Sequence, residues 1–115
     1  MRKESYQFLF ASLLALCTLL IPLFFANNQT LSFFLLLGVS FLMLRIDPVR
    51  SQLLLFICVG VSGPLAEAIA IYSGLWTYAS PVLLGVPVWL PLVWGNAGLY
   101  IIRMSSFLRS LGTGM

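Results

Sequence analysis

Long apolar runs dominate the chain, and short polar segments separate them. The first run, Gln7 to Ala26, would reach about 30 Å as a helix at about 1.5 Å per residue, enough to cross the hydrocarbon of a bilayer. The second, Leu31 to Leu44, is shorter and spans only if the polar residues before it extend the helix. The pattern predicts a single integral membrane domain over residues 1–115, with four helices at about 7–26, 29–44, 48–72 and 86–102.

Proline, glycine and aspartate mark the expected helix ends. Asp47 followed by Pro48 is typical of a helix start, with an N-cap and then proline at the first helical position. Gly74 fits a helix end. In the last helix Pro87 lies close to the start, whereas Pro91 is expected to remove a backbone hydrogen bond and bend the helix.

Composition indicates the class of protein. Hydrophobic residues make up 61% of the chain and charged residues 8%, against about 25% charged residues in soluble domains.

With four spans, all six basic residues fall on one side: Arg2, Lys3, Arg45, Arg50, Arg103 and Arg109. The positive-inside rule then predicts that both termini lie in short cytoplasmic tails. The expected fold is an all-α, four-transmembrane-helix bundle, and the expected location is a bacterial inner membrane. The basic balance indicates topology, so no nucleic-acid partner is expected.

Other features limit the chemistry. The absence of His excludes imidazole metal sites and His-activated nucleophiles, and no metal or cofactor is expected. Cys17 and Cys58 lie in apolar runs and are interpreted as buried, reduced thiols. A signal peptide is the alternative for the first run. That run exceeds the usual apolar region of about 7–15 residues, however, and bulky Phe24 stands where a cleavage site needs a small residue.

The segment 73–85 is uncharged yet apolar, unlike a loop in water. Trp76 and Tyr78 in it, and Trp89 after it, have two interpretations. They form an aromatic belt at the outer interface, or they cover a ligand cavity. Trp94 and Asn96 lie too deep for a belt. A deep Trp usually packs, and a deep Asn usually makes an interhelical hydrogen bond.

Glu67 is the one acid expected at membrane depth, in the outer third of the third helix. It shares a stripe of small residues that predicts helix packing, formed by Gly60, Gly63, Pro64 and Gly74. No basic residue is expected in the bilayer beside it, so the neutral acid is the expected form. Glu67 then either joins helices, through a backbone carbonyl or Asn96, or serves a ligand site as its catalytic acid.

The order of residues after Glu67 resembles that in integral-membrane carotenoid-biosynthesis proteins, the carotenoid hydratases in particular and, loosely, membrane lycopene cyclases. The matching residues are Glu67, Gly74, Trp76, Tyr78, Gly85-Val86-Pro87, Pro91-Leu92 and Trp94. The resemblance covers about residues 60–100. It implies hydratase- or cyclase-like general-acid chemistry on a polyprenoid. Those enzymes are about twice as long, and their further acidic residues have no counterpart here.

Three functions are consistent with these features. The first is a site for an isoprenoid or carotenoid-like lipid in the outer leaflet, with Glu67 at its centre and Tyr78, Trp76, Trp89, Trp94 and Asn96 around it. The second is a non-catalytic accessory subunit of a larger membrane complex, docked through the glycine stripe. The third and weakest is a small proton-coupled transporter. The bilayer is the expected partner in each case, with a homodimer as a further option.

Overall fold

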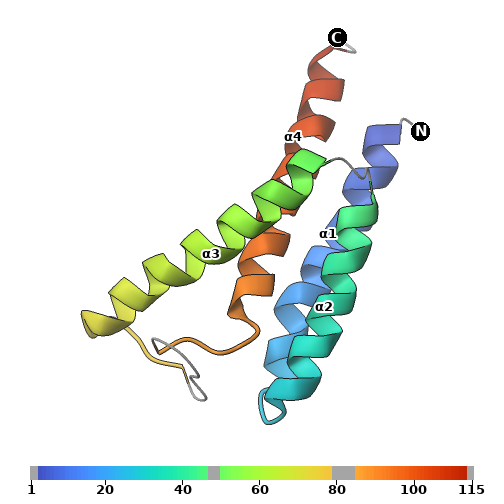
Figure 1. Cartoon of the computed structure of the whole chain (residues 1–115). Coiled ribbons are helices and arrows are strands. Elements are labelled where there is room, and N and C mark those ends of the chain that lie inside the picture. Colours follow the sequence, from blue (N-terminus) through green and yellow to red (C-terminus); the bar gives the residue numbers. More distant parts are fainter. Residues whose placement is uncertain (1–2, 47–49, 79–84, 114–115) are drawn as a thin grey trace.

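The computed structural model describes residues 3–46, 50–78 and 85–113. Within these ranges the chain forms four α-helices and no strand, which confirms the predicted all-helical class. They are α1 (Lys3–Phe24), α2 (Gln29–Arg45), α3 (Arg50–Tyr72) and α4 (Leu90–Thr113). The helices alternate in direction, so the start of α1 and the end of α4 lie at the same end of the molecule (Figure 1).

The helix α4 is the centre of the arrangement, since it packs against each of the other three. The helices α1 and α2 lie side by side, and α3 packs mainly on α4. Towards its C-terminal end α3 diverges from α1 and α2 (Figure 1). The carboxyl end of α3 therefore lies apart from α1 and α2.

Small residues allow α3 and α4 to approach closely. A Cβ at Gly60 would lie 3.0 Å from the carbonyl oxygen of Pro91, and one at Gly63 would overlap the indole ring of Trp94. Two glycines of α4 meet side chains of α3 in the same manner: Gly95 faces Phe56 and Gly98 faces Val59. The predicted packing residues Gly60, Gly63 and buried Pro64 thus lie where α3 meets α4 of the same chain.

Gly74 does not belong to this interface, so its assignment to helix packing is wrong. It has a φ of 87°, and a Cβ placed on it would have nothing within 4 Å. Its N–H donates to Ile71 O, and the Leu75 N–H donates to Ala70 O, at 3.0 and 3.1 Å. These bonds form a Schellman motif, in which a residue with positive φ ends the helix. Gly74 therefore terminates α3, as its position in the sequence also indicated.

The bounds of α4 differ from the prediction of 86–102. The helix begins at Leu90 and continues to Thr113. Pro91 falls in the first turn, where a missing N–H removes no hydrogen bond of the helix interior, so the basis for a bend is absent. The other helices agree with the prediction within a few residues, and the expected cap at Asp47-Pro48 lies outside the described residues.

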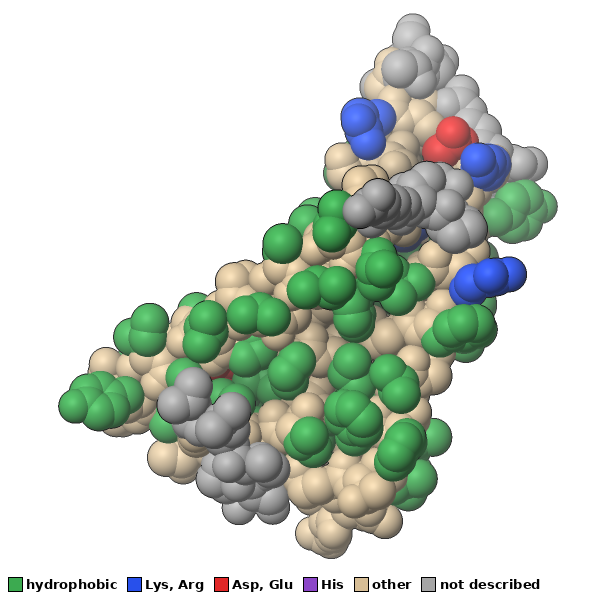
Figure 2. Space-filling model, in the orientation of Figure 1, with side chains coloured by type: hydrophobic (Ala, Val, Ile, Leu, Met, Phe, Trp, Pro, Cys, Tyr) green, Lys and Arg blue, Asp and Glu red, His purple; other side chains and the backbone are tan. Residues whose placement is uncertain are grey.

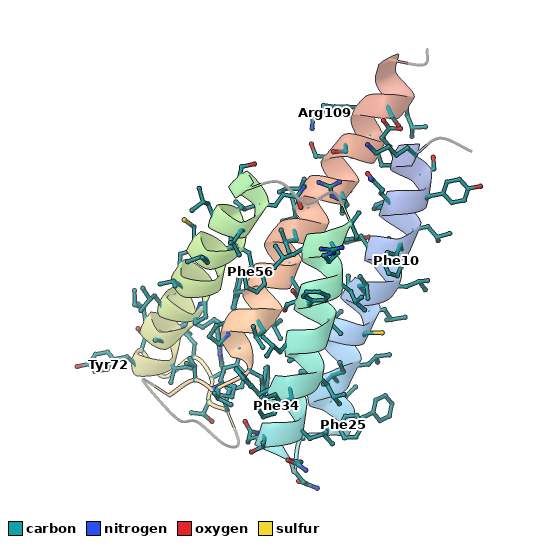
Figure 3. All side chains as sticks on the ribbon, turned by 45° about the vertical axis from the view of Figure 1, so that its right-hand side comes forward. Phe10, Phe25, Phe34, Phe56, Tyr72 and Arg109 are labelled. Atoms are coloured by element: carbon teal, nitrogen blue, oxygen red, sulfur yellow. The ribbon has the colours of Figure 1, made fainter. Side chains whose placement is uncertain are left out.

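Apolar side chains cover the outside of the helices. The buried core is small, and its main cluster consists of Ala11, Leu14, Val39, Met43 and Leu99. Phe10, Phe25 and Phe34 are exposed, and Tyr72 projects from the end of α3 with 94% of its surface exposed (Figure 3). Cys17 and Cys58 are free and exposed, contrary to their predicted burial. Exposed apolar surface on this scale suits lipid or protein contact.

Two helices, α1 and residues 51–72 of α3, are long and apolar enough to cross a membrane. The helix α2 is apolar but shorter. The basic side chains seen in Figure 2 lie from the end where α1 begins and α4 finishes to about the middle of the molecule, and none is seen where α3 ends. The surface pattern is thus an apolar body with its visible basic charge away from the end of α3.

Candidate functional site

Glu67 lies five residues before the end of α3 and is held by two donors from other parts of the chain. The Tyr78 hydroxyl donates to its Oε1, and the Trp94 indole N–H donates to its Oε2. The structure therefore brings together three of the residues expected at the site. Both oxygens accept a hydrogen bond, an arrangement that suits an ionised carboxylate better than the protonated acid predicted from the sequence, in which one oxygen carries the proton.

Local structure explains how the donors reach Glu67. Because Gly63 has no side chain, the indole of Trp94 lies against α3 one turn before the carboxylate. The chain turns at Gly74, and Tyr78 returns towards the helix that it has just left. The Tyr78 ring stands edge-to-face on Trp89, with centroids 6.1 Å apart and an interplanar angle of 89°.

The environment of Tyr78 keeps its phenol protonated. Partial burial raises the pKa of the Tyr78 hydroxyl, and the hydrogen bond and charge of Glu67 raise it further. The side chain of Trp76 acts on this pKa in the opposite direction. Tyr78 thus remains a hydrogen-bond donor throughout the physiological range of pH.

A groove of about 400 Å³ opens beside Glu67. Its walls come from α1, α3, the segment before α4 and α4 itself, and are formed by Thr18, Leu19, Pro22, Glu67, Tyr78, Trp89, Leu90, Val93, Trp94 and Ala97. A second hollow of about 180 Å³ shares Thr18, Leu19, Val93 and Ala97 with it and extends to Tyr100. Both hollows are mostly apolar and adjoin at these four shared residues of α1 and α4, and we call the pair the α1–α4 groove. Glu67 lies at one end.

Asn96 does not contact Glu67, so the predicted alternative of a Glu67–Asn96 hydrogen bond is wrong. Its Nδ2 donates to Thr18 Oγ1 at 3.2 Å, and Thr18 donates to Leu14 O at 2.9 Å. Asn96 lines the inner part of the α1–α4 groove. Its Oδ1, like the Nε1 of Trp89, is buried with no hydrogen-bond partner among the described residues.

Trp76 interacts with Tyr78 but lies outside the groove itself. Its side chain is 44% exposed, and it does not line the α1–α4 groove within the described part of the chain. Sequence reasoning missed the contribution of α1, made by Thr18, Leu19 and Pro22. The signal was Thr18, a polar residue in the middle of an apolar run, which pairs with Asn96 across the helix interface.

The described residues hold no cluster of three His, Cys, Asp or Glu side chains that could bind a metal ion. Comparison with protein-family models, curated proteins and solved structures finds no match for this chain. Function must therefore be argued from the site itself.

Proposed function

We propose that this chain is a small polytopic membrane protein that binds a hydrophobic, isoprenoid-like lipid beside Glu67. The observation that carries the proposal is the α1–α4 groove, which is mostly apolar and has its polar end at Glu67. Ligand pockets combine mostly apolar walls with a few convergent polar groups. The residue order that resembles carotenoid-biosynthesis proteins favours the same class of ligand.

The membrane assignment extends to four spans with both termini in the cytoplasm. Alternating helices and basic residues towards the end shared by both termini are consistent with this topology. Glu67, in the last turns of α3, then belongs to the outer leaflet. An extended lipid chain in the α1–α4 groove would lie roughly along the helices, as acyl chains do in a leaflet.

Binding is better supported than catalysis. A general acid that protonates an alkene needs a proton on its carboxyl group and a clear approach to the substrate. Here both oxygens of Glu67 already accept hydrogen bonds, from Tyr78 and Trp94. These donors orient the carboxyl group at the mouth of the groove, which suits recognition of a polar group on the ligand.

The accessory-subunit function is a second candidate, favoured by the outer face of α3. That helix packs mainly on α4, and Leu54, Ile57, Val61, Leu65 and Ile69 on its other side are exposed. The glycines expected to dock a partner instead face α4 of the same chain. A partner would therefore contact these larger apolar side chains.

Lipid analysis tests the proposal. The protein is purified in mild detergent from a bacterial host that makes an acyclic carotenoid, and extracted lipids are identified by mass spectrometry. We expect an isoprenoid lipid to co-purify with the wild type and to be lost in Ala97→Phe, which fills the groove. Ala66→Phe, at an exposed position of α3 outside the groove, is the matched control. Equal lipid content in both variants would contradict the proposal.

A further inference from the structure

The charge of Glu67 is not neutralised by any described residue. Both of its hydrogen-bond partners, Tyr78 and Trp94, are neutral donors, and no ion pair involving it is found in residues 3–46, 50–78 and 85–113. The neighbouring walls of the groove are apolar or aromatic. A carboxylate in such surroundings lacks the opposite charge that would offset its desolvation.

The described basic side chains near the helix ends lie far from this site, and Arg103 within α4 donates to Gln7 of α1 at 3.2 Å. Lys3 begins α1, Arg45 ends α2, and Arg109 lies near the end of α4, at the opposite end of a molecule 47 Å long. In Figure 2 no basic side chain is visible near the end of α3, and Figure 3 labels Arg109 at the far end of α4. Long-range attraction from these residues is therefore a poor substitute for a cation at Glu67.

Aromatic rings surround the carboxylate on the groove side. Tyr78, Trp89 and Trp94 all line the groove together with Glu67. Indole and phenol rings attract cations through their electron-rich faces, most strongly when the cation is desolvated. One carboxylate with three aromatic side chains at the end of an apolar groove is complementary to an ammonium group joined to a hydrophobic chain.

We propose that the α1–α4 groove prefers an amphiphilic organic cation, a single-chain ammonium whose head pairs with Glu67 and whose chain lies along Leu19, Val93 and Ala97 towards Tyr100. The proposal rests on the proposed lipid-binding function and specifies the head group of the ligand. The shared lining of the two hollows provides the path for the chain. Tyr78 and Trp94 hold the carboxylate in place as the head group approaches.

The test compares three probes with the same fifteen-carbon isoprenoid chain: farnesyl trimethylammonium, farnesol and farnesyl phosphate. The protein is placed in nanodiscs of a zwitterionic phospholipid, so that the bilayer carries no net charge to concentrate a cation. Binding is followed by tryptophan fluorescence, because Trp89 and Trp94 line the groove. We expect the ammonium to bind roughly tenfold more tightly than the alcohol, and the phosphate most weakly.

Substitutions distinguish the contribution of the ligand's head group to affinity from that of its hydrocarbon chain. Glu67→Gln should remove the preference for the ammonium and change the affinity for farnesol by less than about twofold. Glu4→Gln removes an acid in the first turn of α1, at the other end of the molecule, and should change neither affinity. Ala97→Phe should weaken the binding of both the ammonium and farnesol. This variant keeps the proposal testable if circular dichroism shows that Glu67→Gln fails to fold.

The outcomes distinguish this inference from the proposed function. If farnesol binds in an Ala97-sensitive manner but the ammonium binds no more tightly, the lipid site stands and the cation preference is wrong. Equal effects of Glu67→Gln and Glu4→Gln on ammonium binding would also overturn the preference. If no probe binds, both proposals fail.

Discussion

Gly63 determines whether the indole of Trp94 can reach Glu67. A Cβ at position 63 would occupy the place of the indole ring, so Gly63→Ala must displace Trp94 or separate α3 from α4. We expect a loss of about 1–3 kcal/mol in stability, as for other overpacked interfaces, and a shift in tryptophan emission. Thermal unfolding in detergent, followed by circular dichroism, measures the first effect.

Gly38→Ala is the matched control. Gly38 lies in α2, and a Cβ there would have nothing within 4 Å. Because alanine favours a helix over glycine by about 1 kcal/mol, this variant should be as stable as the wild type or more so. Similar losses in both variants would mean that contact with Trp94 is not the cause.

Tyr78 gives a prediction about alkaline pH. Burial and Glu67 raise its pKa above that of a free phenol, about 10. The folded chain therefore keeps a proton that the unfolded chain loses, and this stabilisation is present below about pH 10 and declines as pH rises above it. Between about pH 9 and 11.5 the wild type should lose more stability than Tyr78→Phe.

Unfolding midpoints measured across this range supply the comparison, and Tyr72→Phe is the control. Tyr72 is 94% exposed and projects away from the helices (Figure 3). Its removal should leave the alkaline loss of stability unchanged. An alkaline loss in Tyr78→Phe as large as that of the wild type would contradict the role of Tyr78.

At the scale of the helices, the end of α3 sets the direction in which the chain returns to the site. Gly74 has a φ of 87°, which L side chains rarely adopt, although there is space for a side chain. Gly74→Ala should cost about 1–2 kcal/mol of stability for backbone reasons alone, and Gly74→Asn less, because Asn tolerates this conformation better. Gly112→Ala, also in open space but without a positive φ, serves as the control. If all three variants unfold at the same temperature, the helix end does not depend on Gly74.

Sequence patterns predicted the helices better than they predicted the contacts between them. The apolar run and Gly74 were sufficient to predict α3, because the length and the end of a helix depend on residues close together in the sequence. The start of α4 was placed too early since Pro87 and Pro91 each fit a first turn, and hydropathy cannot choose between them. The sequence suggested Asn96 and not Trp94 as the hydrogen-bond partner of Glu67, because counting residues along a helix gives depth in the membrane but does not show which neighbouring helix a side chain faces. Trp94 and Asn96 are close in depth but about 200° apart around α4 at about 100° per residue, so Asn96 meets α1 instead.

At the scale of the whole molecule, single-cysteine labelling determines how many helices cross the membrane and on which side each connecting segment lies. In a background with Cys17 and Cys58 replaced by serine, one cysteine at a time is introduced at four exposed positions: Asn27, Ser51, Leu75 and Gly112. They follow α1, begin α3, follow α3 and lie near the end of α4. Intact cells are then treated with a membrane-impermeant maleimide, before and after permeabilisation.

Four spans with cytoplasmic termini predict labelling of Asn27→Cys and Leu75→Cys in intact cells, and of Ser51→Cys and Gly112→Cys only after permeabilisation. Labelling at Ser51→Cys and Leu75→Cys distinguishes this topology from one with two spans. If only the two most apolar helices, α1 and α3, crossed the bilayer, Ser51 would face outwards and Leu75 inwards. That reversal would place Glu67 in the inner leaflet, because it lies in the last turns of α3. A ligand in the α1–α4 groove would then enter from the cytoplasmic leaflet, so the labelling pattern also determines from which side a lipid probe must be supplied.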